Sequence, residues 1–149
     1  MCLYKLKKIE LKTDVGYKLF IKEPQGLCGI SSIRTPKKLY SLLYSNNKAL
    51  ETNTWLNEKD YRINFRKKDK IITNNQEAYP VGWHIFLNRK DAEYDIREHE
   101  WNVIIRKVRF KNVVATGIEK AYNKEDSEEY KKENTREYEI VVAKDMFIL

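Results

Sequence analysis

The segment from Tyr79 to Tyr94, which reads YPVGWHIFLNRKDAEY, constrains the fold of this chain more than any other. Its Pro80-Val81-Gly82 stretch predicts a turn, and the residues from Trp83 to Leu87 predict a short strand. Asn88 is a typical helix N-cap, and Asp91 suits a capping box and the positive end of the helix dipole. The segment therefore predicts a turn, a strand and a helix in direct succession.

Apolar residues that alternate with polar ones predict strands elsewhere in the chain. The first strand, from Val15 to Ile21, is rich in β-branched and aromatic residues. A second, from Tyr61 to Phe65, alternates with basic residues and should expose them on one side. The two longest strands are expected from about Trp101 to Val114 and from Tyr138 to Leu149.

A second helix is expected to begin at Thr35-Pro36, where threonine caps and proline occupies the first helical position. Leu39, Leu42 and Leu43 would then share one face, and the helix would end at Ser45-Asn46-Asn47. Strands dominate and the two helices are inserted at different points. We therefore expect an α+β fold around a mostly antiparallel sheet, with residues 1–149 forming a single compact domain.

The charge of the chain is unevenly distributed. The net charge is +7, but eight acidic and five basic residues between Glu119 and Glu139 give that stretch −3, which leaves +10 for the remainder. We expect residues 119–139 to include a charged, mobile segment. The positive remainder favours an anionic partner.

The start of the chain has no signal-peptide pattern, because lysines interrupt each apolar run, and no segment is long and apolar enough to predict a membrane span. Cys2 and Cys28 are too few for a disulfide scaffold, which favours a reducing compartment. The sequence therefore predicts a cytoplasmic protein that does not bind membranes.

His84 stands in a run of aromatic residues just before a helix N-terminus, and two interpretations are open. In the first, Trp83 or Tyr79 provides a stacking surface, while His84 and the free amides after Asn88 bind an anion. In the second, His84 is a hydrogen-bonded structural residue within an aromatic cluster.

The expected strand that begins near Trp101 carries a second candidate group. Alternation places Lys107, Arg109 and Lys111 on one face, whereas Arg106 shares the opposite, apolar face. An arginine on an apolar face needs a partner, either a protein carboxylate or a bound phosphate, because an unpaired buried charge is costly. The candidate ligand-binding residues are Tyr17, Arg34, Tyr79, Trp83, His84, Arg106 and Arg109.

Further basic residues occur in two short groups, which are Arg62, Arg66, Lys67, Lys68 and Lys70, and Arg34, Lys37 and Lys38. The second group lies at the start of an expected helix, where cations oppose the helix dipole and so favour an anionic partner. Groups of this kind also occur simply as solvated surface.

Three patches of the sequence resemble small proteins encoded by bacterial viruses. They are the opening MCLY with the GYKLF strand, the stretch YPVGWHIFLNRKDA, and the closing VVAKDMFIL. The resemblance implies a viral accessory role rather than a particular reaction, placed in the host cytoplasm and directed against a host defence system.

Motifs for catalysis are sparse: the sequence lacks a nucleophile elbow, a Walker loop and a Rossmann glycine pattern. The best enzyme alternative is an ADP-ribosyltransferase-like fold, with Tyr17 and Lys18 on the first strand, Trp83-His84 in the aromatic segment and Glu137 or Glu139 as the acid. The first strand carries neither an arginine nor a histidine, which argues against this alternative.

A zinc site is not expected either. Cys2, Cys28, His84 and His99 include the right ligand types but lack the usual close spacing. We therefore expect no metal and no cofactor.

Taken together, the sequence predicts a non-enzymatic accessory protein that binds an anionic, nucleotide-type small molecule and antagonises a host process. A small ligand is favoured over a long nucleic acid, which should bind weakly and non-specifically, because the basic residues form short groups with aromatic neighbours. The alternative is a module that binds nucleic acid or a protein, such as a host defence protein. Homo-oligomers are compatible with either prediction.

Overall fold

The computed structural model describes residues 3–22, 39–41, 49–61, 70–96, 102–121 and 136–149. These residues are mostly strand, with one α-helix, α1 (Arg89–Ile96), and one short 3-10 helix (Glu58–Tyr61). The strands are β1 (Lys5–Leu6), β2 (Val15–Lys22), β3 (Leu39–Ser41), β4 (Trp55–Asn57), β5 (Lys70–Ile72), β6 (Ala78–Pro80), β7 (Trp83–Phe86), β8 (Val103–Ala121) and β9 (Arg136–Ile148).

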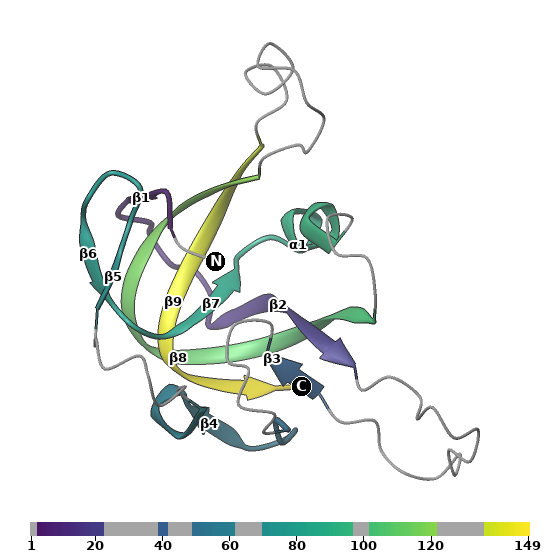
Figure 1. Ribbon diagram of the computed structural model, residues 1–149. Helices are drawn as coiled ribbons and strands as arrows, with labels where there is room; N and C mark the ends of the chain where they lie inside the picture. The colour runs from purple at the N-terminus through teal and green to yellow at the C-terminus, as the bar shows by residue number, and fades with distance from the viewer. Residues whose placement is uncertain (1–2, 23–38, 42–48, 62–69, 97–101, 122–135) are drawn as a thin grey trace, which may run out of the picture.

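Four strands close into a ring in which every pairing is antiparallel. β8 pairs with both β2 and β9, and β7 pairs with both β2 and β9. The pairing of β2 with β7 rests on one residue pair, Tyr17 with Phe86, so the ring is a small barrel with a narrow closure. β8 and β9 form a long, curved hairpin that runs through the whole molecule (Figure 1).

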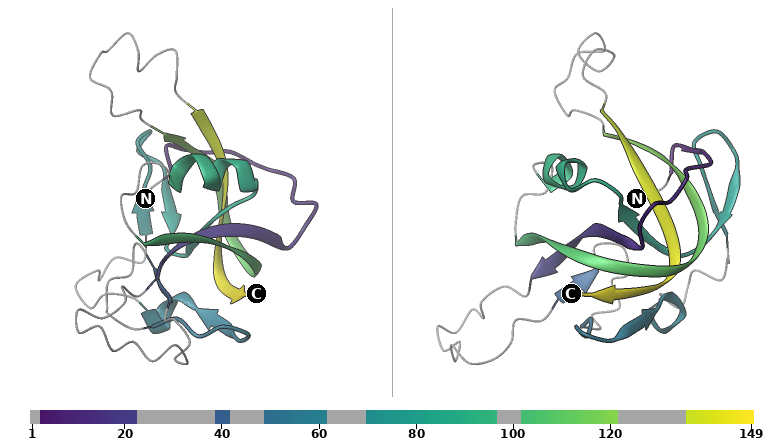
Figure 2. Two further views of the ribbon diagram at one scale, coloured as in Figure 1. Left: turned by 90° about the vertical axis from the view of Figure 1, so that its right-hand side faces the viewer. Right: turned by 180° about the vertical axis from the view of Figure 1, so that it is seen from behind.

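The remaining elements are attached around this ring. β1 pairs with β8, β3 with β2, and β4 with β9, while β5 and β6 form a separate hairpin. α1 packs against β2, β7 and β8. β4 lies at the end of the molecule opposite α1 (Figures 1 and 2). The outer surface of β4 and of the strand ends beside it is therefore not covered by the helix.

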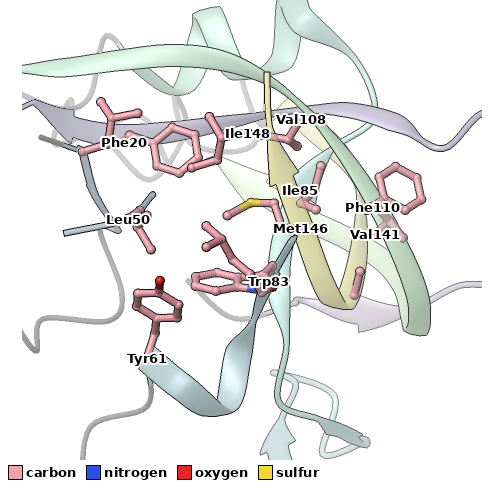
Figure 3. Close-up of a cluster of buried hydrophobic side chains, with 13 residues drawn as sticks. Phe20, Leu50, Tyr61, Trp83, Ile85, Val108, Phe110, Val141, Met146 and Ile148 are labelled. Atoms are coloured by element: carbon pink, nitrogen blue, oxygen red, sulfur yellow. The ribbon is translucent and has the colours of Figure 1, made fainter. Parts of the chain in front are cut away.

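Hydrophobic side chains pack into two clusters, one on each face of β7. Trp83 and Ile85 belong to the cluster drawn in Figure 3, where Trp83 packs against Tyr61 with 5.6 Å between ring centroids. Phe86, on the other face, belongs to the second cluster together with Tyr138. All four residues of β7 are consequently buried, as expected for a strand that is covered on both sides.

The structure confirms the mostly antiparallel sheet, and β2, β7, β8 and β9 occur where the sequence predicts strands. β8 continues to Ala121 and β9 begins at Arg136, so both ends of the charged stretch 119–139 belong to the hairpin. Residues 122–135 lie outside the described residues, and a mobile segment there stays a prediction.

The expected helix from Thr35-Pro36 is wrong where the structure describes it. Leu39–Ser41 is a strand that pairs with Phe20–Lys22 of β2, and the rest of the expected helix lies outside the described residues. The spacing of the leucines favours a helix and depends only on residues close in the sequence. The hydrogen bonds to the edge of β2 join segments far apart in the sequence, and they determine the structure here. Tyr61 likewise ends a 3-10 helix instead of beginning a strand, and residues 62–66 are not described.

At the start of α1 the structure confirms the predicted N-cap, Asn88, but Asp91 does not form the predicted capping box. The Asn88 side-chain oxygen accepts a hydrogen bond from the Lys90 amide at 2.9 Å. The carboxylate of Asp91 instead accepts two hydrogen bonds from the guanidinium of Arg136, at 2.8 and 3.0 Å. Asp91 therefore ties the helix to β9.

Gly82 connects β6 to β7 and is required by a close approach of two chain segments. A Cβ atom at this position would lie 2.7 Å from the carbonyl oxygen of Ala143 and 2.8 Å from Cγ1 of Val142. Pro80 is the last residue of β6 and pairs with Lys70, so the expected turn is reduced to the link Val81-Gly82.

Candidate functional site

The aromatic segment that the sequence suggests as a ligand site is part of the protein interior. Trp83 is 0% exposed, Tyr79 1% and His84 2%. The indole nitrogen of Trp83 donates a hydrogen bond to the carbonyl oxygen of Leu56 at 3.0 Å. A ligand could stack on Trp83 only if the core opened, so the expected surface of Trp83 and His84 is not present in this structure.

His84 takes part in a buried chain of hydrogen bonds. The Leu3 amide donates to the Tyr79 hydroxyl oxygen at 3.0 Å, and that hydroxyl lies 2.9 Å from Nε2 of His84. Burial, and then the nearby charge of Lys18, lower the pKa of His84 to about 3, while a weaker contact with the Gly82 backbone acts in the opposite direction. The ring is therefore neutral at physiological pH, and the tautomer decides whether Nε2 donates or accepts in its hydrogen bond with the Tyr79 hydroxyl. Its Nδ1 has no hydrogen bond of good geometry.

Two further ionisable groups lie near these hydrogen bonds: Lys18 of β2 is buried, and Glu119 of β8 is half-buried. The Lys18 ammonium donates to the carbonyl oxygen of His84 at 2.9 Å, beside the single residue pair that joins β2 to β7. Burial lowers the pKa of Lys18 to about 8. Burial, and then the charge of Asp95, raise the pKa of Glu119 to about 8. Perturbed groups of this kind often mark functional sites, but the hydrogen bond of Lys18 joins β2 to β7 and so supports the closure of the barrel.

The sequence contains a signal for the burial of Lys18. Lys18 falls in phase with Gly16 and Phe20, and all three residues are buried on the same face of β2. Glu119 has no comparable signal, because its burial depends on contacts with strands and a helix from distant parts of the chain.

The other expected ligand-binding residues do not converge on His84. Arg106 is half-buried and donates two hydrogen bonds to the main-chain oxygen of Leu149, at 2.8 and 3.2 Å, so its partner is neither a carboxylate side chain nor a phosphate. Tyr17 is half-buried, with the guanidinium of Arg89 5.9 Å from its ring centroid. Arg34 lies outside the described residues.

Arg109 belongs to a different group, which brings cations and aromatic rings together on the outside of the barrel. Trp55 of β4 pairs with Phe147 of β9, and Phe147 pairs with Arg109 of β8, so the three residues form one row across the sheet. The ring centroids of Trp55 and Phe147 are 5.5 Å apart. The Lys111 ammonium lies 4.1 Å from the Trp55 ring centroid, and the Arg109 guanidinium 5.8 Å from it. We call Trp55, Lys107, Arg109, Lys111 and Phe147 the basic–aromatic surface.

The three cations of this surface are exposed, as alternation along the strand predicts, and the two rings are half-buried. Arg109 donates to a carboxylate oxygen of Asp14 at 2.9 and 3.1 Å, but both side chains are about half exposed, so this ion pair contributes little. Within the described part of the chain, Lys107 and Lys111 form no ion pair. The charge of these lysines is thus available to an anion.

Besides Asp14, a second acidic side chain lies at this surface. Asp145 is the cross-strand neighbour of Lys111, and its carboxylate accepts hydrogen bonds from the side-chain amides of Asn57 and Asn112. These two amides fix the position of the carboxylate. The sequence could not have placed Trp55 here, because β4 is a short strand whose partner β9 lies far along the chain.

A shallow, open pocket of about 370 Å³ lies elsewhere, between residues 6–8, 78–80 and 114–116. Its lining is mainly apolar, and Lys7 and Lys8 stand at its edge. Tyr79 is the sequence-predicted site residue that reaches it. No residue of the basic–aromatic surface lines this pocket.

The residues of the enzyme alternative are not brought to one surface. Glu137 and Glu139 are exposed on β9, whereas Trp83 and His84 are buried. Across the residues that the structure describes, no group of three histidine, cysteine, aspartate or glutamate side chains is arranged to hold a metal ion. Cys2, Cys28 and His99 lie outside these residues.

In the described ranges, no helix combines the length and the apolar character needed to cross a membrane. No family model, curated protein or solved structure matches the chain.

Proposed function

We propose that this protein binds an anionic, nucleotide-type ligand at the basic–aromatic surface and does so without catalysis. One observation carries the proposal: the Lys111 ammonium and the Arg109 guanidinium lie 4.1 and 5.8 Å from the ring centroid of the same half-buried tryptophan, Trp55. A ring beside exposed cations can stack with a base while the cations bind the phosphate.

The contact between Lys111 and Trp55 does not prevent a base from binding. An exposed cation–π contact is worth about 0.5–1 kcal/mol, whereas stacking of a base on an aromatic side chain is worth about 1–3 kcal/mol. A base can therefore displace the ammonium from the ring. The flexible lysine side chain then remains close enough to reach the phosphate of the same ligand.

The biological role that we propose follows from the resemblance to phage-encoded proteins. Binding of a nucleotide-type ligand in the host cytoplasm would interfere with a host process, such as a defence system that uses or senses such ligands. Deletion of the gene from the virus should then reduce its growth on hosts that carry that defence system and leave growth on other hosts unchanged.

The ligand proposal is tested with a panel of labelled nucleotides and short oligonucleotides, measured by fluorescence anisotropy at low salt. We expect Trp55→Leu to weaken binding of the preferred ligand by about tenfold, which lies within the range for loss of one stacking partner. Lys111→Gln should weaken it by several-fold through the loss of one phosphate contact.

Lys90→Gln is the matched control, because Lys90 is an exposed lysine on α1, away from β4, and its loss should leave affinity unchanged. Thermal melts establish that each variant is folded. If no member of the panel binds, or if Trp55→Leu and Lys90→Gln behave alike, the proposal is wrong.

A further inference from the structure

We infer that the ligand of the basic–aromatic surface is a single-stranded nucleic acid whose backbone follows β8 and whose bases stack on Trp55 and Phe147. This inference rests on the proposed function and names the ligand class more narrowly. The sequence favours a free nucleotide instead, because it shows the basic residues only as short groups and not their arrangement in space.

The three cations of the surface are evenly spaced along β8. Lys107, Arg109 and Lys111 are alternate residues of one strand and are all exposed. Alternate residues of a strand lie about 7 Å apart, so the row spans about 14 Å. Such a row is too long for the phosphates of one nucleotide to contact at both ends. It matches the regular series of single phosphates along an extended strand.

The two rings lie to one side of this row of cations. Phe147 lies on the strand next to Arg109, and Trp55 on the strand beyond it. Neighbouring strands are about 5 Å apart, so the backbone positions of the two rings lie about 5 to 10 Å to one side of β8. The Lys111 ammonium and the Arg109 guanidinium reach across to within 4.1 and 5.8 Å of the Trp55 ring centroid. A base lies to one side of its own phosphate at a comparable distance. A strand that binds along β8 can therefore place its bases over the rings.

The basic–aromatic surface also differs from a small-ligand site in shape. Sites for small ligands are concave and enclose most of the ligand, and the pocket between residues 6–8, 78–80 and 114–116 includes no residue of this surface. The basic–aromatic surface lies on the outer side of three neighbouring strands, at the end of the barrel opposite α1 (Figures 1 and 2). An open face suits an extended polymer, which gains affinity from several weak contacts in a row.

A nucleic acid duplex cannot stack its bases on these rings in the same way. Its bases are paired and stacked on one another, so a base can reach Trp55 only after it leaves the stack. The cations still attract the phosphates of a duplex, which gives weak, non-specific binding. The structure therefore points to a preference for single strands over duplexes of the same sequence.

The test measures binding of thymidine monophosphate, of thymidine oligonucleotides of increasing length and of a duplex, each from low to physiological salt. We expect an oligonucleotide of about six residues to bind at least tenfold more tightly than the monophosphate and than the duplex. With three phosphates neutralised, log K should fall with log salt with a slope of about −2, since each phosphate contributes about −0.7 for single strands.

Variants connect this binding to the named residues. Lys107→Gln and Lys111→Gln should each reduce the slope by about 0.7, while Trp55→Leu should weaken binding and leave the slope almost unchanged. Lys90→Gln should alter neither quantity.

The possible results separate this inference from the proposed function. If the monophosphate binds as tightly as the oligonucleotides and Trp55→Leu weakens it, the proposed function stands and the inference is overturned. The inference is also overturned if the duplex binds as tightly as the single strand. If the protein binds none of these three ligands and no other nucleotide, both the inference and the proposed function are wrong.

Discussion

Replacement of Glu119 by glutamine is expected to stabilise the protein at pH 8 by more than about 1 kcal/mol and to have little effect near pH 4. Burial, and then the charge of Asp95, raise the pKa of Glu119 from 4.5 to about 8, while Lys18 acts in the opposite direction. Between these pH values the folded protein holds a proton that the unfolded chain has released, so the glutamate makes stability fall as the pH rises from 4.5 to 8. A glutamine of the same shape lacks this cost.

Lys18 has the opposite effect in a different pH window. Burial lowers its pKa from 10.5 to about 8, so between pH 8 and 10.5 the unfolded chain binds the proton and the folded protein does not. Stability should therefore rise again with pH in that range. The two groups together predict a local minimum of stability near pH 8, and Glu119→Gln should remove the falling side of it.

Urea unfolding at pH 4.5, 6 and 8 measures these differences directly. Glu137→Gln provides a matched control, because Glu137 is an exposed glutamate close to Glu119 in the hairpin. Two results would contradict the burial of Glu119 as described: equal effects of the two substitutions at pH 8, or a stabilisation by Glu119→Gln that does not grow from pH 4.5 to pH 8.

Replacement of His84 by alanine is expected to cost about 3 kcal/mol in stability and to leave the affinity of the folded protein for its ligand unchanged. The side chain is 2% exposed, and its loss removes the partner of the Tyr79 hydroxyl at 2.9 Å while leaving space in the core. The melting temperature should fall by about 6 to 12 degrees.

The same histidine should make the protein sensitive to acid. Burial, and then Lys18, lower its pKa from 6.5 to about 3, so the folded state disfavours the charged ring and stability is lost as the pH falls from 6.5 towards 3. His84→Ala should lack this part of the loss, although it is less stable near neutral pH. Melting curves from pH 7 to pH 4, recorded beside a binding assay, test both statements. If His84→Ala melts normally but no longer binds ligand, His84 belongs to the site and not to the core.

The parts of the fold that sequence patterns predict are those with local causes. Asn88 identifies the start of α1 because a cap acts on amides two residues away, and it does so in the structure. Alternation predicts β8, and with it the exposed face of Lys107, Arg109 and Lys111, because side chains alternate along any strand.

What the sequence does not predict depends on pairing between distant segments. Leu39–Ser41 forms a strand because β2 presents an edge to it, which overrides the helical spacing of the leucines. Trp83 is buried because clusters form on both faces of β7, and its neighbours Ile85 and Phe86 show this only as a run of apolar residues.

The dependence on pairing between distant segments also explains why sequence patterns do not predict the candidate site. Trp55 comes within 4.1 Å of the Lys111 ammonium only because β4 pairs with β9 and β9 pairs with β8. Nothing in the short segment around Trp55 indicates these pairings. Sequence patterns correctly predict that the three cations share one exposed face. They do not predict that the two rings lie beside this face.

Photochemical cross-linking tests the proposed site most directly. A thymidine oligonucleotide that carries a photoreactive base is bound to the full-length protein, irradiated and digested, and the modified peptides are identified by mass spectrometry. Bases that stack on an aromatic ring cross-link to it readily, so we predict attachment at Trp55 or Phe147, and loss of the Trp55 product in the Trp55→Leu variant. Attachment confined to other surfaces, such as the pocket edge at Lys7 and Lys8 or the exposed side of α1, would contradict the assignment of the basic–aromatic surface as the binding site.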